Sequence, residues 1–436
     1  MKIKLTFLLI LFCAFSFAQN EFITLWKPSN PSTTNPVSSD TQIYFSGDGT
    51  NYKIYWEEVG NPSHNGTLNN VNTVSERKLI DFGTGLSPDA TYIVKVSNGN
   101  GIFSSFSGGF GDTEKLIEVK QWGNIKWQSM TNAFGNCKNM DVTATDIPDL
   151  TLVTRMDGMF YECFGLKGNS TFGLWDTSNV TDMSFLFAFA VKFNQNIGNW
   201  NTSKVTSMEA MFEGLIPNPG NFDQYIGNWD TSNVKDMQWM FFSSKFNQNI
   251  GNWNTSKVTN MSYMFYYSLF FDQDLGKWNL KSINKINNFF NNAPLSCQNY
   301  NKTLIGWANS PETPNNLQFV DNYYVKYSSP EAVTARNYLK NTKGWTITGD
   351  SYNPSCGLAT NELDIKKTQV YPNPAKDFIS IKNLKSDVDL EIYDMQGKLV
   401  KREKYKNSQF SIKNLSKGIY ILKVPSENYS QKLIVE

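Results

Sequence analysis

The chain has 436 residues, of which 14% are aromatic and only 18% are charged, and its formal net charge is +1. This length exceeds what one hydrophobic core usually organises, so we expect two to four domains. Basic residues are concentrated towards the two ends, which leaves a weakly acidic body. Such a surface does not attract phosphate backbones, and nucleic acid is therefore not expected as a partner.

Residues 1–18 have the pattern of a secretory signal peptide. Lys2 and Lys4 precede a short apolar run, and small side chains stand near the end of the segment. This pattern predicts cleavage between Ala18 and Gln19. The apolar run is too short to cross a bilayer, and no later stretch reaches the length of a transmembrane helix. We therefore expect an extracellular protein, on the cell surface or secreted, without a transmembrane segment.

Residues 19–112 contain short runs in which apolar and polar side chains alternate, such as Gln42–Phe45, Tyr52–Val59 and Thr91–Ser97. Clusters of Gly, Asn and Pro separate these runs. Alternation with a period of two between turn signals is typical of an antiparallel β-sandwich. We predict a small sandwich for this region.

A unit of about 25 residues repeats through residues 113–292. Its markers are Trp, Met and Phe residues at fixed positions: Trp175, Trp200, Trp229 and Trp253, Met183, Met208, Met237 and Met261, and Phe187, Phe212, Phe241 and Phe265. Fixed self-similarity of this length is the signature of a solenoid, in which each unit buries its apolar side against its neighbours. We therefore expect these markers to form the core of the repeats, in preference to a sugar-stacking or metal-binding surface.

The spacing within a unit predicts its local structure. Val180, Met183 and Phe187 stand at offsets 0, 3 and 7, as on one side of a short helix, and the residues before each Trp fit an extended segment. We predict a mixed fold: a leucine-rich-repeat-like solenoid with a short strand and a helical turn in each coil, flanked by small N-terminal and C-terminal β-sandwiches. Polar residues such as Thr202 and Gln195 are predicted to form hydrogen-bonded ladders between coils.

Residues 293–350 lose the repeat motif and are predicted to cap the C-terminal end of the solenoid. They contain two helix-compatible stretches, Tyr300–Ala308 and Pro330–Thr342. Residues 351–367 are polar and are interpreted as a linker.

Four cysteines remain after the signal peptide, and an even number in an exported chain permits disulfides. Cys297 and Cys356 are a candidate disulfide that would close the cap. Cys137 and Cys163 stand 26 residues apart in matching contexts, so they are expected on adjacent coils, either as buried thiols or as a bridge.

Residues 368–436 have the pattern of a last, small β-sandwich. Pro372 and Pro374 follow Tyr371 and flank Asn373, where they would stop strand pairing. Gly397 is placed to turn a hairpin, and Gly418 permits a tight bend close to Tyr420.

Two resemblances follow from these motifs. The sequence Phe-Asn-Gln-Asn-Ile-Gly-Asn-Trp-Asn-Thr-Ser-Lys-Val-Thr-x-Met-x-x-Met-Phe at 193–212, repeated at 246–265, resembles the BspA-type leucine-rich repeat family of bacterial surface proteins. The likeness covers about residues 115–310. It implies a surface interaction role, such as adhesion, without naming a ligand. The segment before the repeats looks like a PKD-like module, although the Trp-Gly-Asp-Gly centre of that module is absent.

The tail resembles the type A C-terminal sorting domain of type IX secretion. The matching blocks begin with Val-Tyr-Pro-Asn-Pro-Ala at 370–375 and end with Gln-Lys-Leu-Ile-Val at 431–435. The resemblance implies the type IX secretion machinery as a partner, translocation across the outer membrane in Bacteroidota, and removal of the tail. Surface anchoring and release of the mature protein both stay open.

The sequence does not favour an enzyme. His64 is the single histidine and stands in a predicted loop, and acids such as Asp176 and Asp230 recur with the coil, as structural residues do. We expect no catalytic residues, metal site or cofactor. The predicted function is an adhesin-like protein that binds a protein or glycan ligand through the repeats. The alternatives are a secreted carbohydrate-active enzyme or accessory glycan-binding protein, and a passive spacer.

Overall fold

The structure is a computed structural model that describes residues 20–32, 34–107, 111–357, 369–371, 375–382, 384, 388–394, 398–405, 409–425 and 429–435. It divides into two compact units, Met1–Cys356 and Gly357–Glu436. Each unit has its own cluster of buried hydrophobic side chains. The predicted cleavage residues Ala18 and Gln19 lie outside the described residues.

The first unit begins with a seven-stranded sheet in the order β4-β3-β6-β1-β8-β9, in which β7 also pairs with β3. A separate two-stranded sheet joins β2 to β5. All of these pairs are antiparallel except β8 with β9, which is parallel. The strands are β1 (Phe22–Trp26), β2 (Gln42–Phe45), β3 (Gly47–Glu58), β4 (Asn61–Thr73), β5 (Lys78–Asp81), β6 (Tyr92–Ser97), β7 (Ile102–Phe106), β8 (Leu116–Gln121) and β9 (Asp141–Val142).

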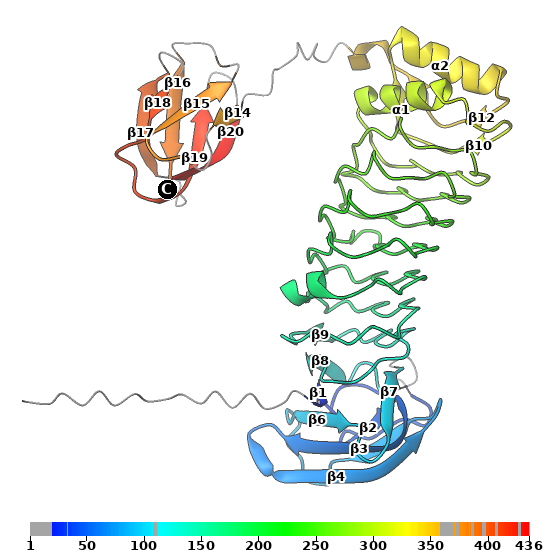
Figure 1. Ribbon diagram of the computed structural model, residues 1–436, viewed down its shortest axis with the longest axis vertical. Helices are drawn as coiled ribbons and strands as arrows, with labels where there is room; N and C mark the ends of the chain where they lie inside the picture. Colours follow the sequence, from blue (N-terminus) through cyan, green and yellow to red (C-terminus); the bar gives the residue numbers. More distant parts are fainter. Residues whose placement is uncertain are drawn as a thin grey trace, which may run out of the picture. The chain divides into compact units, whose positions relative to one another are not determined.

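The N-terminal sheet continues into the repeats. Strand β1 pairs with β6 on one side and with β8 on the other, so the sheet crosses the expected boundary between residues 112 and 113. One cluster of buried side chains then runs from Phe22 to Ile347. The N-terminal region therefore shares its core with the repeats. Figure 1 shows the repeat units stacked between this sheet and two helices at the other end of the unit.

The repeat units are joined by hydrogen bonds between their backbones. Alternate N–H groups of one unit donate to carbonyl oxygens of the next, as from Phe185 to Glu209 and from Phe189 to Glu213, both at 2.7 Å. The N–H groups between them close turns onto the residue three positions earlier, as from Ala188 to Phe185 at 3.1 Å. Single parallel bridges mark the same register in successive units: Arg155 with Asp182, Asp182 with Ser207, Ser207 with Asp236, Asp236 with Asn260, and Asn260 with Lys285.

The predicted leucine-rich-repeat-like solenoid, with a short strand and a helical turn in each coil, is therefore wrong. Between β9 and Cys297 the described chain contains no α-helix and only one 3-10 helix, η2 (Ser170–Leu174). The described structure consists mainly of several small β-sheets, isolated bridges and turns, with few helices. An α-helix requires each N–H to bond to the carbonyl four residues earlier, and here every second N–H bonds to the next unit instead.

Left-handed residues explain why the spacing resembled a helix. In most units two residues four positions apart have positive φ, such as Phe185 at 57° and Phe189 at 62°. A left-handed residue breaks a right-handed helix. The result is a ribbon of consecutive turns with a period of four, which we call the turn ribbon. It buries residues at spacings of three and four, as an amphipathic helix would.

The predicted polar ladders are confirmed. Threonine hydroxyls in the position of Thr202 donate to a backbone carbonyl of the next unit at 2.9–3.0 Å, the donors being Thr177, Thr202, Thr231 and Thr255. Amides in the position of Gln195 donate back to the preceding unit, as from Gln195 to the Lys167 carbonyl at 3.0 Å and from Gln273 to the Asn247 carbonyl at 2.9 Å. These bonds satisfy backbone carbonyls that the bridges leave without a partner.

Two helices close the C-terminal end of the first unit, and both were predicted. Helix α1 (Cys297–Asn309) begins after Ser296, whose hydroxyl accepts from the N–H of Asn299. Helix α2 (Pro330–Asn341) begins after Ser329 in the same manner, with Pro330 in its first turn. Two short parallel sheets accompany the helices and pair β10 (Gln318–Phe319) with β12 (Thr346–Ile347) and β11 (Lys326–Tyr327) with β13 (Ser351–Tyr352).

A buried ion pair fastens α2 to the end of the unit. The Arg336 guanidinium donates to both carboxylate oxygens of Asp350 at 2.7 Å, and the Tyr300 hydroxyl from α1 donates to the same carboxylate at 2.9 Å. The Asp350 side chain is 0% exposed. Burial, together with the Asp350 charge, raises the pKa of Tyr300 well above its usual value, so this phenol remains a donor.

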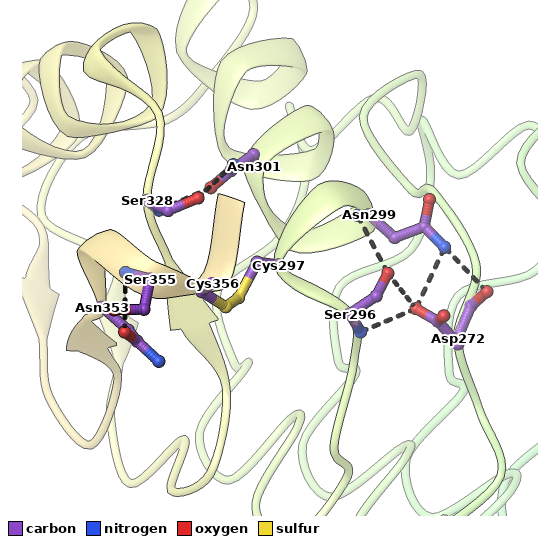
Figure 2. The surroundings of a disulfide bond; sticks show 9 residues. All are labelled: Asp272, Ser296, Cys297, Asn299, Asn301, Ser328, Asn353, Ser355 and Cys356. Carbon is purple, nitrogen blue, oxygen red and sulfur yellow. Dashed lines mark hydrogen bonds between the residues drawn. A yellow bond between two sulfur atoms is a disulfide. The ribbon is translucent and has the colours of Figure 1, made fainter. Parts of the chain in front are cut away.

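The candidate disulfide is formed in the structure. Cys297, the first residue of α1, is bonded to Cys356 in η3 (Pro354–Gly357), 59 residues later (Figure 2). Beside it, Asp272 of the last repeat accepts from the N–H of Ser296 at 2.8 Å and from the side chain of Asn299 at 3.0 Å. The start of α1 is thus held both by the repeats and by the end of the unit.

Cys137 and Cys163 are free and buried, and the Cys163 thiol donates to the Phe134 carbonyl at 3.1 Å. Of the two alternatives for this pair, the structure has the thiols. Burial raises the pKa of both, which opposes formation of a thiolate.

The second unit consists of two sheets around one core. Three strands pair in the order β14-β15-β18 and four in the order β17-β16-β19-β20. Their bounds are β14 (Gln369–Tyr371), β15 (Phe378–Lys382), β16 (Asp389–Tyr393), β17 (Leu399–Lys404), β18 (Phe410–Ser411), β19 (Gly418–Val424) and β20 (Tyr429–Val435). Buried residues such as Ile379, Leu390 and Leu422 form the core.

Candidate functional site

The repeat markers are buried and therefore do not form a ligand surface. Their exposed fractions range from 0% to 4% over Trp175, Trp200, Trp229, Trp253, Met183, Met208, Met237, Met261, Phe187, Phe212, Phe241 and Phe265. The phenylalanines stack from unit to unit, as Phe187 does on Phe212 with ring centroids 5.8 Å apart. The accessible surface of these units is formed by other, outward residues.

The outward side of the turn ribbon carries a second set of aromatic residues, all half-buried, which we call the aromatic face. Its members are Tyr161, Phe185, Phe189, Trp239, Phe242, Tyr263, Tyr266 and Tyr267. Contacts between their rings hold them together: Tyr161 and Phe189 have centroids 5.5 Å apart, and Phe242 stacks on Tyr266 at 5.1 Å. Large half-buried aromatic side chains are enriched where proteins bind partners.

Five members of the aromatic face occupy left-handed positions, namely Phe185, Phe189, Trp239, Tyr263 and Tyr267, with φ from 56° to 62°. Near the two ends of the repeats the equivalent positions hold Asn132 and Asn136, and Asn288 and Asn292. Asn tolerates this conformation, whereas a bulky side chain in it costs about 1–2 kcal/mol. The central units thus accept strain at positions where aromatic rings become accessible, and strain of this kind is concentrated at functional sites.

Two glutamates lie within the aromatic face. Backbone bonds place Glu209 beside Phe185 and Glu213 beside Phe189. Burial, and then the charges of Asp236 and Asp182, raise the pKa of Glu209. Burial, and then the Glu209 charge, raise the pKa of Glu213 to about 7. Within the described ranges, neither carboxylate has a hydrogen-bond or ion-pair partner.

Sequence reasoning missed this face because it interpreted the spacing as a helix and looked only at the buried stripe. A signal was present. In three units an aromatic residue stands between two buried markers, namely Phe185, Trp239 and Tyr263. A side chain at that place points away from the buried stripe, and a large apolar residue there has no folding reason of its own.

Two other places in the first unit bring polar or charged side chains together. A cavity of about 740 Å³ lies where the N-terminal sheet meets the first repeats, and its polar lining includes Arg77, Glu114 and Lys138. Glu114 pairs with Lys138 at 3.1 Å. His64 lies in β4 and not in the predicted loop; it contacts Glu58 at 2.7 Å and meets the Trp56 ring edge-on. In neither place do the described residues bring a nucleophile, a base and an orienting group together.

The described residues also do not gather three or more His, Cys, Asp and Glu side chains in an arrangement that could hold a metal ion. No helix in this part of the chain is long and apolar enough to cross a membrane.

The predicted sorting residues are only partly described. Pro372, Asn373, Pro374 and Gly397 lie outside the described residues. The backbone of Tyr371 pairs with Ser380 in the first sheet of the second unit. Gly418 opens β19, and the Tyr420 hydroxyl donates to the Ser416 carbonyl at 2.8 Å, which closes the preceding turn.

Comparison with protein families gives two matches. The family described as Mycoplasma protein of unknown function, DUF285, matches residues 128–217 and 215–307. The secretion system C-terminal sorting domain matches residues 369–436. No curated protein and no solved structure matches the chain. The sorting-domain match indicates type IX secretion, so the protein is exported to the cell surface or secreted, and its tail engages the type IX machinery.

Proposed function

We propose that this exported protein is an adhesin-like interaction protein of the BspA type, which binds a macromolecular partner through the aromatic face of its repeats and catalyses no reaction. The observation that carries the proposal is the strained aromatic set, Phe185, Phe189, Trp239, Tyr263 and Tyr267. Asn or Gly would serve the fold better at these positions, and both are used at equivalent places elsewhere in the repeats.

Two further observations support binding over catalysis. The aromatic face extends over several units, as extended faces of repeat proteins do when they bind partners. The acids of the repeats mostly have structural partners. Asp176 and Asp230, for example, accept from the N–H groups of Ser178 and Ser232 at 3.0 and 2.9 Å.

Binding assays with the intact mature protein test this proposal. The wild type and the Trp239→Ala/Tyr263→Ala variant would be applied to immobilised matrix proteins and to a glycan array. Tyr225→Ala is the matched control, because Tyr225 is 50% exposed but lies outside the turn ribbon. We expect the wild type and the control to bind the same partner and the double variant to bind it at least tenfold more weakly.

An absence of any partner, or equal binding by all three proteins, would overturn the proposal. Hydrolysis of a polysaccharide by the wild type that is lost in Glu213→Gln would instead favour a carbohydrate-active enzyme.

A further inference from the structure

The aromatic face is interrupted in one repeat unit. Where the flanking units carry Phe185 and Trp239, this unit has Ala210, which is 0% exposed beneath its neighbours. The N–H of Phe185 donates to the Glu209 carbonyl at 2.7 Å, and the N–H of Ala210 donates to the Gln238 carbonyl at 2.8 Å. This register places Glu209 between two units that carry aromatic rings.

A second carboxylate lies four residues further along the same unit. The N–H of Phe189 donates to the Glu213 carbonyl at 2.7 Å, and the N–H of Gly214 donates to the Phe242 carbonyl at 2.8 Å. Glu213 is therefore level with Phe242 of the next unit, and its neighbour Gly214 is level with Phe189 of the preceding unit. The unit has no aromatic side chain of its own at these outward positions, and among the described residues no ring contact joins Phe185 or Phe189 to Trp239 or Phe242.

The negative charge at this interruption is not neutralised by the described part of the chain. Arg155, a basic side chain of an earlier unit, is already bonded to Asp157 at 2.9 Å and to Asp182 at 3.1 Å. Asp182 and Asp236 repel the charge on Glu209, which in turn repels the charge on Glu213. A cation that binds here would gain its direct attraction and would also relieve this repulsion.

We propose that the interruption, where Glu209 and Glu213 stand in a unit flanked on both sides by units with aromatic residues, binds an arginine side chain of a partner protein. A guanidinium is planar, stacks on ring faces, and donates to carboxylates in a fixed fork. A neutral sugar cannot neutralise the pair, which is why the charge favours a basic protein segment over a glycan. This inference rests on the proposed function and names the chemistry that the partner brings.

The probe is a synthetic nonapeptide of arginine, with a citrulline nonapeptide of the same length as a neutral analogue. Calorimetric titration of the mature protein at pH 8, where Glu213 is ionised, would compare the wild type with Glu209→Gln/Glu213→Gln, which removes both carboxylates and keeps the side-chain shape. Glu76→Gln/Glu331→Gln is the matched control, because both of those acids are exposed and lie outside the repeats. Thermal denaturation would verify that all three proteins are folded.

We expect the Glu209→Gln/Glu213→Gln variant to bind the arginine peptide at least tenfold more weakly, and the control variant and the wild type to bind it equally. The citrulline peptide should bind to the wild type at least tenfold more weakly than the arginine peptide does. An equal loss of affinity for the arginine peptide in Glu209→Gln/Glu213→Gln and in the control variant would show that the peptide is attracted by negative charge in general, and it would overturn the inference. Unchanged binding by Glu209→Gln/Glu213→Gln would also overturn it. A glycan that binds the wild type and this variant equally would also overturn it.

The experiments distinguish a failure of the proposed function from a failure of the arginine-binding inference. If Trp239→Ala/Tyr263→Ala binds immobilised partners normally, the proposed function is wrong whatever the peptide does. If that variant loses its partner while Glu209→Gln/Glu213→Gln retains arginine binding, only the present inference is wrong.

Discussion

The indole groups of the repeats offer a measurement of how the units are held together. The Nε1–H of Trp253 donates to the Ile226 carbonyl of the preceding unit at 3.1 Å. Trp200, Trp229 and Trp278 make the same bond at 2.7–3.2 Å. Trp175, in the equivalent position, has no partner for its Nε1 among the described residues. The same position within the repeat therefore carries an indole that is hydrogen-bonded in some units and one that is not hydrogen-bonded in the unit of Trp175.

The perturbation is Trp253→Phe, with Trp175→Phe as its matched control. Both indoles are 3% exposed, and each stacks on the Trp of the next unit at 6.2–6.3 Å, so the lost volume is similar. Trp175 also stacks on Phe172 at 4.5 Å and meets Trp122 edge-on at 5.5 Å, and such ring pairs contribute about 0.5–1.5 kcal/mol each. Trp253→Phe also loses a hydrogen bond worth about 1 kcal/mol, whereas Trp175→Phe removes a buried donor whose missing partner costs about 1–3 kcal/mol. These two terms add to about 2–4 kcal/mol, and the additional ring contacts of Trp175 offset about 1 kcal/mol of this, so we expect Trp253→Phe to lower the free energy of unfolding by about 1–3 kcal/mol more than Trp175→Phe.

Guanidinium denaturation of the oxidised protein, followed by far-UV circular dichroism, measures this difference. The free energy of unfolding should fall with denaturant concentration at the same slope for both variants, so that their denaturation midpoints can be compared directly. Trp200→Phe should behave like Trp253→Phe. If Trp175→Phe is as destabilising as Trp253→Phe to within about 0.5 kcal/mol, the indole hydrogen bonds do not stabilise the contact between units.

Three other outcomes are expected. Since the pKa of Glu213 is raised from 4.5 to about 7, the folded chain binds the proton of this carboxyl group more tightly than the unfolded chain does. The resulting contribution to the free energy of unfolding is therefore complete below pH 4.5 and is lost as the pH rises through 7. Glu213→Gln should remove this decline, which is at most about 3 kcal/mol because the group is partly exposed, and denaturation at pH 4 and pH 8 would reveal it. Reduction of the Cys297–Cys356 disulfide, which closes 59 residues, should cost about 2–4 kcal/mol, and the melting temperature of a Cys297→Ser/Cys356→Ser variant should not respond to reductant. Asp350→Asn, which leaves Arg336 buried without its counter-ion, should cost about 3–5 kcal/mol in the same denaturation assay, and a loss below about 1 kcal/mol would contradict the burial of the pair.

Several features of the first unit could be predicted from the sequence because they follow from composition and spacing alone. The 25-residue period locates the residues that fill the interior, such as Trp200 and Phe212, since a buried position must recur in each unit. The cap helices follow from local signals, with Ser296 and Ser329 as N-caps. The threonine ladder follows because equivalent residues of stacked units lie side by side.

The tertiary structure alone decided the backbone conformation of the units and the location of the candidate site. Offsets of three and four record which side chains are buried, and they are the same for an amphipathic helix and for a ribbon of turns. The helix and the ribbon differ in the carbonyl oxygen to which each N–H group donates. In the ribbon, every second N–H donates to a carbonyl about 25 residues away, in the next unit. Once Phe185 and Trp239 are left-handed, their rings point outward, and Glu209 and Glu213 come to lie in a unit between those that carry these rings. No local pattern could place these residues together, because the hydrogen bonds that align them join segments far apart in the chain.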